Sequence, residues 1–188
     1  KPKTAPVFLT VEETKSVIKT AIEENCVQGW VWLLFTGMRP CGATGEFRKF
    51  WKTEGYGWNM IFDGKITVDP VISKTGEARK ITVRDNLQEW LDVFSADKDK
   101  YPIYPRDWER KFRRVKEKAL GKNHPKYRTK DLTRHTAITY MTPIFTSYID
   151  LCRETGNSEK IIRKHYDGKV SKKSAKEFWN ISPNDFGL

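Results

Sequence analysis

The sequence predicts a mainly α-helical domain with one small antiparallel β-sheet, which is an α+β fold. Most of the chain places apolar residues at helical spacing, between recognisable capping and stop signals. One region, residues 66–83, instead alternates apolar and polar residues on both sides of a turn. No internal repeat, low-complexity segment or linker interrupts the 188 residues, so we expect 1–188 to form a single domain.

Two helices are predicted before the strands. In FLTVEETKSVIKTAIEE, Thr10 is placed to cap the helix, and Glu13 completes a capping box. The segment GWVWLLFTGMRP is almost entirely apolar and stops at Gly37 and Pro40, which is typical of a buried helix. A polar stretch through Trp58 follows, for which no element is predicted.

The strands are predicted at Ile66–Val71 and Arg79–Val83, where β-type residues alternate with polar ones. Between them, Lys74, Thr75 and Gly76 predict a tight turn. The two runs therefore predict a β-hairpin with Lys74 at its tip.

Helical spacing returns after the hairpin. NLQEWLDVFSA carries its apolar residues on one face. After the loop YPIYPRD, the strongly basic RDWERKFRRVKEKAL is predicted to turn arginine and lysine outward and Trp108, Phe112, Val115 and Leu120 inward. TKDLTRHTAITYM is a turn that leads into a helix, which Pro143 ends or kinks.

The last third of the chain predicts three short helices. SYIDLCRETGNSEKIIRKHY contains two of them, the first closed by Gly156 and the second starting near Ser158. The tail, residues 170–188, holds an amphipathic helix with Phe178 and Trp179 expected on one exposed side. A tail of this kind is suited to docking, either onto its own core or onto a neighbouring molecule.

The charge balance indicates a polyanionic partner. The chain has 35 lysines and arginines against 24 acidic residues, which gives a net charge of +11. Such an excess is typical of proteins that bind nucleic acid. No long apolar segment or lipidation motif points to a membrane partner.

Cysteines and histidines predict neither disulfides nor a metal site, and we expect no cofactor. The three cysteines are scattered and form no CxxC motif, and the three histidines lack ligand spacing. We therefore expect a reducing, cytoplasmic environment, associated with the nucleoid where the partner is DNA. The chain begins at Lys1 without a signal peptide, so we expect a fragment of a longer protein.

Four residues have the chemistry that metal-free cleavage of a DNA phosphodiester requires. Tyr166 is a candidate nucleophile, and Lys74 is a candidate acid for the departing sugar oxygen. Arg39 and Arg134 are candidate phosphate ligands, because the guanidinium fork binds two phosphate oxygens and stays charged. Each also has a plainer interpretation: a solvated lysine, arginines in surface ion pairs, and a tyrosine that packs at a helix end.

The order of the sequence boxes favours the catalytic interpretation. LLFTGMRP, ISKTGEARKITV, TRHTAITYM and TGNSEKIIRKHY resemble the successive boxes of the tyrosine recombinase (phage-type integrase) catalytic domain. The spacing agrees, with 23 residues from Arg134 to Asn157 and nine from Asn157 to Tyr166. The resemblance covers essentially the whole chain, from FLTVEE to KEFWNI.

The resemblance implies a DNA recombinase that cuts and rejoins strands without ATP or metal. Arg39 and Arg134 would hold the scissile phosphate. Lys74 would be the general acid, and Tyr166 would form a covalent 3′-phosphotyrosine link. The resemblance also implies a homotetramer on double-stranded DNA, with the 170–188 tail exchanged between protomers; the isolated domain as a monomer is the alternative. The N-terminal DNA-clamping domain usual in the family has no match in this chain.

Three departures from the family pattern fall at the candidate site. Asp131 stands where a histidine is usual, which leaves three roles open: orienting Arg134, accepting the tyrosine proton, or disabling the site. The GHS box reads GNS, so Asn157 donates a hydrogen bond but no proton. Gly42 replaces an acidic residue that would support Arg39.

These departures keep two other functions open. The first is a degenerate family member that only binds DNA. The second is a type IB topoisomerase-like enzyme, which the compact size and the TGMRP and TRHT boxes disfavour. His135 and His165 lie beside candidate catalytic residues, and a packing role is preferred for both.

The basic helix supplies a candidate DNA-binding face. Its members would follow a phosphate backbone and position the duplex without reading its sequence. The alternative is an ordinary solvated helix surface. The candidates are Arg106, Arg110, Lys111, Arg113, Arg114, Lys116 and Lys118.

Overall fold

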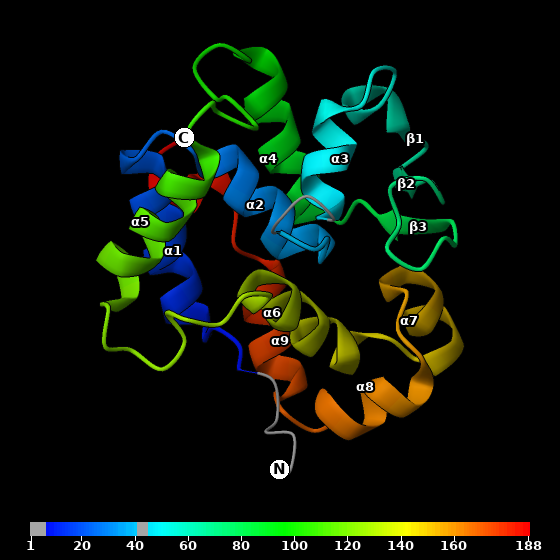
Figure 1. The fold of residues 1–188 in the computed structure, drawn as a ribbon. Coiled ribbons are helices and arrows are strands. Elements are labelled where there is room, and N and C mark those ends of the chain that lie inside the picture. The colour runs from blue at the N-terminus through cyan, green and yellow to red at the C-terminus, as the bar shows by residue number, and fades with distance from the viewer. Residues whose placement is uncertain (1–6, 41–44) are drawn as a thin grey trace.

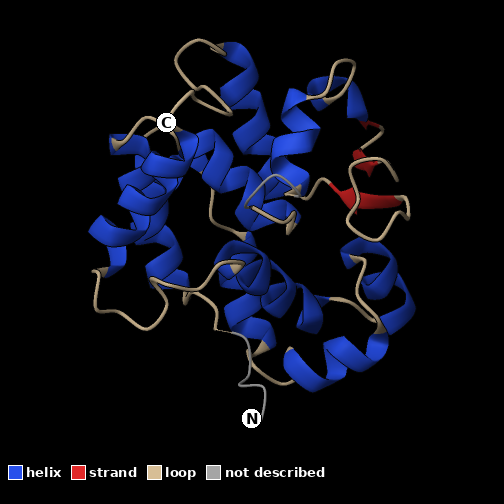
Figure 2. Ribbon diagram, in the orientation of Figure 1, coloured by secondary structure: helices blue, strands red, loops and turns tan. Residues whose placement is uncertain are grey.

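The computed structural model describes residues 7–40 and 45–188, and these ranges form a mainly helical fold with one small sheet (Figures 1 and 2). This confirms the predicted α+β class. The helices are α1 (Val11–Glu23), α2 (Val27–Thr36), α3 (Glu46–Lys52), α4 (Asp85–Ala96), α5 (Trp108–Leu120), α6 (Leu132–Met141), α7 (Tyr148–Thr155), α8 (Glu159–His165) and α9 (Lys172–Trp179). Short 3-10 turns η1 (Gly57–Met60), η2 (Thr142–Ile144) and η3 (Pro183–Phe186) complete the helical elements of the described residues.

The sheet has three antiparallel strands in the order β1 (Ile61–Phe62), β2 (Lys65–Val68) and β3 (Arg79–Thr82). The pairing of β2 with β3 confirms the predicted hairpin, and Ile66 lies opposite Ile81. Both predicted strands are shorter than expected, since β2 ends at Val68 and β3 at Thr82.

The connection between β2 and β3 is longer than the predicted tight turn. The N–H of Gly76 donates to the carbonyl of Ser73 over 3.4 Å, which closes a turn around Lys74 and Thr75 as expected. A second turn precedes it, because the N–H of Ser73 donates to the carbonyl of Asp69 over 3.0 Å. Lys74 therefore lies exposed on a loop of residues 69–78 rather than at the tip of a tight hairpin turn.

Helix α2 forms the centre of the molecule, as its apolar sequence predicts. All ten of its residues are buried, and it packs against α1, α4 and α6. It ends at Gly37, which adopts a left-handed conformation with φ of 66°. A Cβ at this position would lie 3.2 Å from that of Ala137, so the glycine also allows α2 and α6 to approach closely.

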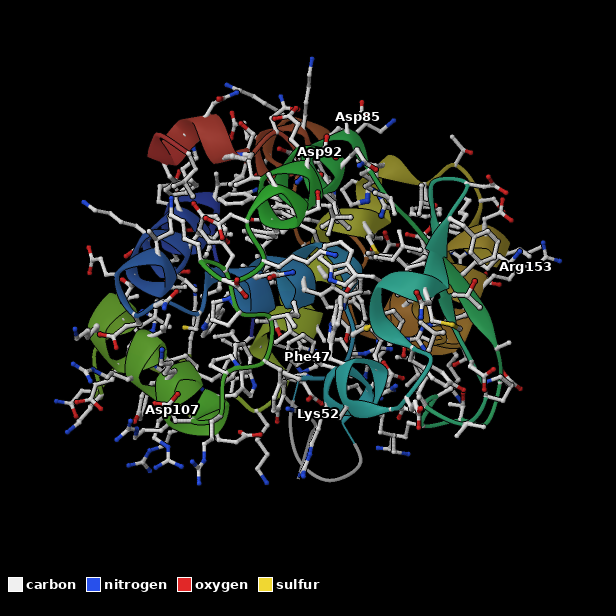
Figure 3. The ribbon with its side chains drawn as sticks, turned by 90° about the horizontal axis from the view of Figure 1, so that it is seen from above. Phe47, Lys52, Asp85, Asp92, Asp107 and Arg153 are labelled. Carbon is white, nitrogen blue, oxygen red and sulfur yellow. The ribbon has the colours of Figure 1, made fainter. Side chains whose placement is uncertain are left out.

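The helix ends follow the local signals in the sequence. The capping box of Thr10 and Glu13 is present, and Gly156 closes α7 in a left-handed conformation. The hydroxyl of Ser171 accepts a hydrogen bond at the start of α9. Charged side chains such as Asp107 and Arg153 lie at the periphery, as Figure 3 shows from above.

The tail packs on the core of its own chain. Phe178 is fully buried, and its ring stacks on that of Tyr140 with centroids 4.2 Å apart. The indole N–H of Trp179 donates to the carbonyl of Tyr140 over 3.0 Å. The prediction that Phe178 and Trp179 are exposed is therefore wrong, because α9 turns this face toward α6. Exchange of the tail between protomers stays a prediction.

Within the described ranges, no helix combines the length and apolar character needed to cross a bilayer.

Candidate active site

Arg134 is the centre of the candidate site. It lies in the first turn of α6 and is only 4% exposed. Its Nη1 donates to the carbonyl of Gly37 and its Nη2 to the carbonyl of Thr155, both over 2.7 Å. These carbonyls are at the C-terminal ends of α2 and α7, where helices leave unpaired acceptors and negative partial charge. Arg134 thus joins three helix ends that are distant in sequence.

Asn157 contacts the same guanidinium. Its Oδ1 accepts from Nη2 of Arg134 over 3.2 Å. Arginine has only donors, so the amide oxygen of Asn157 must face it and the amide NH₂ faces away. This NH₂ remains a donor for a further group in the site.

A buried carboxylate, Glu46, connects two more arginines to the site. Both oxygens of Glu46 accept from Arg79, over 2.6 and 3.1 Å, and Oε1 also accepts from Nη1 of Arg39 over 2.8 Å. Glu46 is fully buried, and the side chains of Arg79 and Arg39 are 4% and 20% exposed. Arg39 therefore has a fixed orientation at the end of α2, and the plainer expectation of a surface ion pair does not describe it.

The arginines outnumber the carboxylates in this cluster. Burial alone would raise the pKa of the Glu46 carboxyl, but Arg79, Arg134 and Arg39 together lower it to about 2. Burial, with Arg39 as the next contribution, lowers the pKa of Arg134 to about 10. Among the residues that the structure describes, Arg134 forms no ion pair. Three guanidinium groups around one carboxylate leave an excess of positive charge, which favours binding of an anion.

Tyr166 ends α8 beside this cluster. It is buried, and its hydroxyl lies 2.9 Å from Nδ1 of His135. Burial raises the pKa of the phenol, while Arg134 and Arg39 oppose this shift and Asp131 adds to it. Both arginines are close enough to Tyr166 to act on its hydroxyl electrostatically. Their convergence on one phosphate stays a prediction.

His135 contacts the tyrosine, although packing was the preferred prediction for it. Successive residues of a helix point about 100° apart, and Arg134 and His135 do contact different groups. Tyr166 lies against the face of α6 that carries His135 and, one turn earlier, Asp131. Burial lowers the pKa of the imidazole, Asp131 opposes the shift, and Arg134 and His165 reinforce it.

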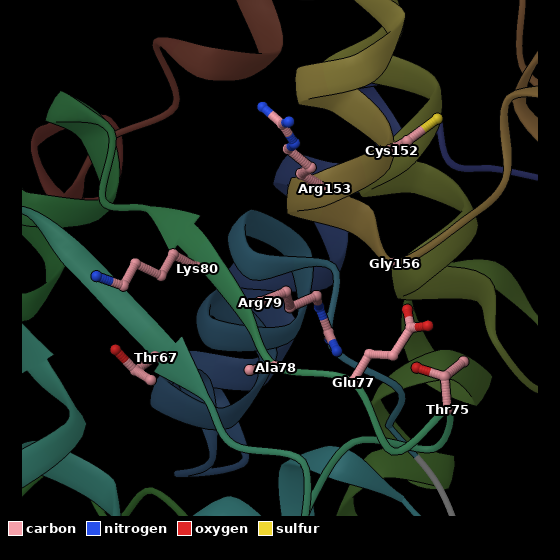
Figure 4. Close-up of a pocket in the computed structure, with 9 residues that line it drawn as sticks. All are labelled: Thr67, Thr75, Glu77, Ala78, Arg79, Lys80, Cys152, Arg153 and Gly156. Carbon is pink, nitrogen blue, oxygen red and sulfur yellow. The ribbon is translucent and has the colours of Figure 1, made fainter.

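Lys74 forms no hydrogen bond or ion pair with any of these groups in the described part of the chain, and the Asp131 side chain acts on Tyr166 and His135 only electrostatically. Lys74 is exposed on the β2–β3 loop. A cavity of about 470 Å³ separates this loop from the C-terminal end of α7, and its lining includes Thr75, Arg79 and Gly156 (Figure 4). The Lys74 loop therefore faces the turn that carries Asn157.

The candidate site thus joins five of the six predicted residues: Arg39, Asp131, Arg134, Asn157 and Tyr166. Sequence reasoning missed Glu46 and Arg79, and it preferred a packing role for His135. The prediction on Gly42 lies outside the described residues. Position 46 nevertheless supplies an acidic partner to Arg39, four residues after the position where the resemblance predicts one.

The basic helix α5 presents part of the predicted DNA-binding face. Arg106, Arg110, Arg113 and Arg114 are exposed. Several of the predicted residues are already paired: Arg110 with Asp107, Arg114 and Lys118 with Glu24, and Lys111 with the carbonyl of Asn25.

Lys116 does not belong to this face. It is 9% exposed, and its Nζ donates to the carbonyl of Thr129 over 3.5 Å. Its ammonium also lies over the rings of Phe112 and Tyr127. The outward orientation predicted for Lys116 is wrong, because the helix turns this position toward the 121–130 segment.

In comparisons with known proteins, no family model, curated protein or solved structure matched this chain.

Proposed function

We propose that the candidate site carries out phosphodiester transfer with Tyr166 as the nucleophile. The observation that carries this proposal is the cluster of Arg39, Arg79 and Arg134 around the single carboxylate of Glu46, next to the tyrosine hydroxyl. A phosphodiester is an anion whose charge grows on the oxygens opposite the nucleophile as the transition state forms. Fixed guanidinium donors stabilise this charge without having to reorganise.

The proposed substrate is double-stranded DNA, and the proposed reaction is the cutting and rejoining of strands by a tyrosine recombinase. The net charge of +11 and the exposed arginines of α5 support DNA as the anion. The order of the sequence boxes supports recombination rather than another phosphoryl transfer. Neither metal nor ATP is needed, because the covalent link keeps the energy of the phosphodiester for rejoining.

The proposed cleavage step forms one bond to phosphorus and breaks another, and several predicted residues have a part in this exchange. The Tyr166 oxygen forms a bond to phosphorus, and the bond from phosphorus to the 5′ oxygen breaks. The departing 5′ oxygen takes a proton from Lys74, whose loop moves toward the site. Arg39, Arg134 and the free NH₂ of Asn157 bind the phosphate oxygens during this exchange.

A nicked suicide duplex tests the proposal. Because the target sequence is unknown, the probe is a library of nicked duplexes with a randomised centre, incubated with the protein and resolved under denaturing conditions. We expect a covalent protein–DNA adduct that is absent from Tyr166→Phe. Tyr148→Phe is a matched control, since it removes an exposed hydroxyl at the start of α7 that is bound to Asp167.

Two other outcomes would overturn this proposal. Retention of the library without an adduct would favour the module that only binds DNA. An adduct that persists in Tyr166→Phe would place the nucleophile elsewhere in the chain.

A further inference from the structure

We infer that His135 is the base that removes the phenol proton of Tyr166, with Asp131 stabilising the imidazolium that results. This inference rests on the proposed function, because it assigns a proton step within that reaction. The observation behind it is the 2.9 Å contact between Nδ1 of His135 and the hydroxyl of Tyr166.

The tyrosine needs a base more than an exposed phenol does. Its pKa is raised by burial, so at neutral pH it carries its proton, and a protonated phenol is a weak nucleophile. A base at hydrogen-bonding distance of the proton is the geometric requirement for general-base catalysis. His135 meets it without any rearrangement of the described residues.

The surroundings of His135 favour the neutral, accepting form. Four groups act on its ring: Asp131 and Arg134 from α6, and His165 and Tyr166 from the end of α8. Burial lowers the pKa of the imidazole from its ordinary value of 6.5, Asp131 opposes this shift, and Arg134 and His165 add to it. At neutral pH the ring is therefore unprotonated, and Nδ1 accepts the phenol hydrogen bond when the proton of the ring is on Nε2.

Asp131 is less suited to take the proton itself. It acts on both Tyr166 and His135 electrostatically, but its carboxylate forms no hydrogen bond to either within the described ranges. The N–H of His135 donates to the backbone carbonyl of Asp131 over 2.8 Å, so the two residues lie one helical turn apart on one face. In this position, the carboxylate of Asp131 stabilises the imidazolium that forms when His135 takes up a proton.

The proton balance is complete with residues of this chain. In cleavage, the O–H bond of Tyr166 breaks, the new bond to phosphorus forms, and Nδ1 of His135 gains the proton. Lys74 gives a different proton to the 5′ oxygen. In rejoining, each proton returns along the same route, so His135 protonates the tyrosine as it leaves.

The test compares single replacements of two histidines, His135 and His124. The readout is the rate of adduct formation by a saturating amount of protein on the nicked duplex library. We expect His135→Ala to slow this rate by roughly a hundredfold or more, the usual contribution of a positioned base. His124→Ala is the control, because His124 lies beside Glu13 and Lys126, away from the candidate site.

The pH profile separates a base from a packing group. The wild-type rate should rise as His135 loses its proton below about pH 6.5 and then stay flat through about pH 9. In His135→Ala the reaction requires the phenolate, so the rate should rise about tenfold per pH unit across that range. A variant that is slow but keeps the wild-type profile would show a merely structural role and overturn the inference.

A modified leaving group separates the base from the acid. A 5′-bridging sulfur leaves as a thiolate and needs no proton from the protein. With this duplex, Lys74→Ala should regain its rate and His135→Ala should not. Full recovery of His135→Ala would place His135 on the leaving-group side and overturn the inference.

The two proposals fail differently. If the wild-type chain forms an adduct that depends on Tyr166 and His135→Ala forms it equally fast, only this inference is lost. If the wild-type chain forms no such adduct, the proposed function is overturned and this inference with it.

Discussion

Arg39 has a guanidinium that is oriented by Glu46 yet remains 20% exposed, so it is open to a ligand on one side. If it binds the scissile phosphate, Arg39→Ala should slow adduct formation by roughly a hundredfold or more, corresponding to about 3–4 kcal/mol of transition-state stabilisation. Arg39→Lys keeps the charge but loses the planar fork, and it should recover only part of the rate. The measurement is the single-turnover rate at saturating protein, which removes differences in DNA affinity.

The control for this comparison is Arg48→Ala. Arg48 lies on α3, the same helix as Glu46, but its side chain is exposed. Equal rates for Arg39→Ala and the wild type would contradict the role of Arg39 in the site.

Glu46 is predicted to be essential for stability as well as for the site. It is the carboxylate that both Arg79 and Arg39 bind, and it is fully buried. Glu46→Gln removes the charge while keeping the shape, which leaves the buried guanidinium of Arg79 without a counter-ion. We expect a loss of about 3–5 kcal/mol in the free energy of unfolding, measured by urea denaturation at pH 7. A loss below about 1 kcal/mol would indicate that the cluster is solvated.

The same carboxylate predicts a pH dependence. Burial opposes the ionised form of Glu46, but Arg79 and the other arginines prevail and hold its pKa at about 2, below the ordinary value of 4.5. A lowered pKa in the folded state stabilises the fold above pH 4.5, and this contribution is lost as the pH falls from 4.5 to about 2. The difference in unfolding free energy between wild type and Glu46→Gln should therefore shrink across this window, and a constant difference would contradict the assignment.

Glu46 and Arg79 were missed for the same physical reason. Arg39, Arg134 and Tyr166 lie at helix ends in recognisable boxes, whereas Glu46 and Arg79 act as partners across 33 positions in sequence. A buried ion pair of this separation leaves no periodic or local signal. A packing role was preferred for His135 only because successive helical residues point about 100° apart, so that His135 points away from Arg134. That angle does not reveal that α8 ends beside the face of α6 that carries His135.

At the scale of elements, prediction succeeded where local signals exist. Capping residues, left-handed glycines and apolar periodicity place seven of the eight helices from α1 to α8, all but α3, close to their observed positions. Helix α3 has seven residues and β1 has two, which is too short for a periodic pattern. Helix α3 lies in the polar stretch that ends at Trp58, and β1 lies between that stretch and the first predicted strand. The exposed face of α9 was wrong because tertiary packing, not periodicity, decides which face of an amphipathic helix finds a partner.

Helix α9 should contribute strongly to the stability of its own chain. Phe178 is fully buried against Tyr140, so Phe178→Ala should lower the free energy of unfolding by about 3–5 kcal/mol. Lys176→Ala is the control on the same helix, since this side chain is exposed and its loss should change stability by less than about 0.5 kcal/mol.

Exchange of the tail between protomers is tested by repeating the unfolding measurement at several protein concentrations. A tail that packs within its chain gives an unfolding midpoint independent of protein concentration, and the structure predicts this result for the protein without DNA. A midpoint that rises with concentration would show instead that the chains associate, as tail exchange requires.

At the scale of the whole molecule, the net charge of +11 predicts DNA binding that depends on salt. The logarithm of the binding constant should fall linearly with the logarithm of salt concentration, with a slope of about −0.9 for each phosphate neutralised. In the structure, some basic residues of α5 are exposed and are expected to contribute to the salt dependence of DNA binding, whereas others are not. Arg113 is exposed and has no ion pair within the described ranges, so Arg113→Ala should reduce the slope by about one.

Lys116 provides the matched comparison on the same helix. Its ammonium is held by the carbonyl of Thr129 and the rings of Phe112 and Tyr127, so Lys116→Ala should cost stability and leave the slope unchanged. Fluorescence anisotropy with a generic duplex over a range of salt concentrations measures both slopes. A slope that is equally flat for the wild type and Arg113→Ala would mean that the charge of α5 serves solubility, and the DNA path would then have to follow another face of the molecule.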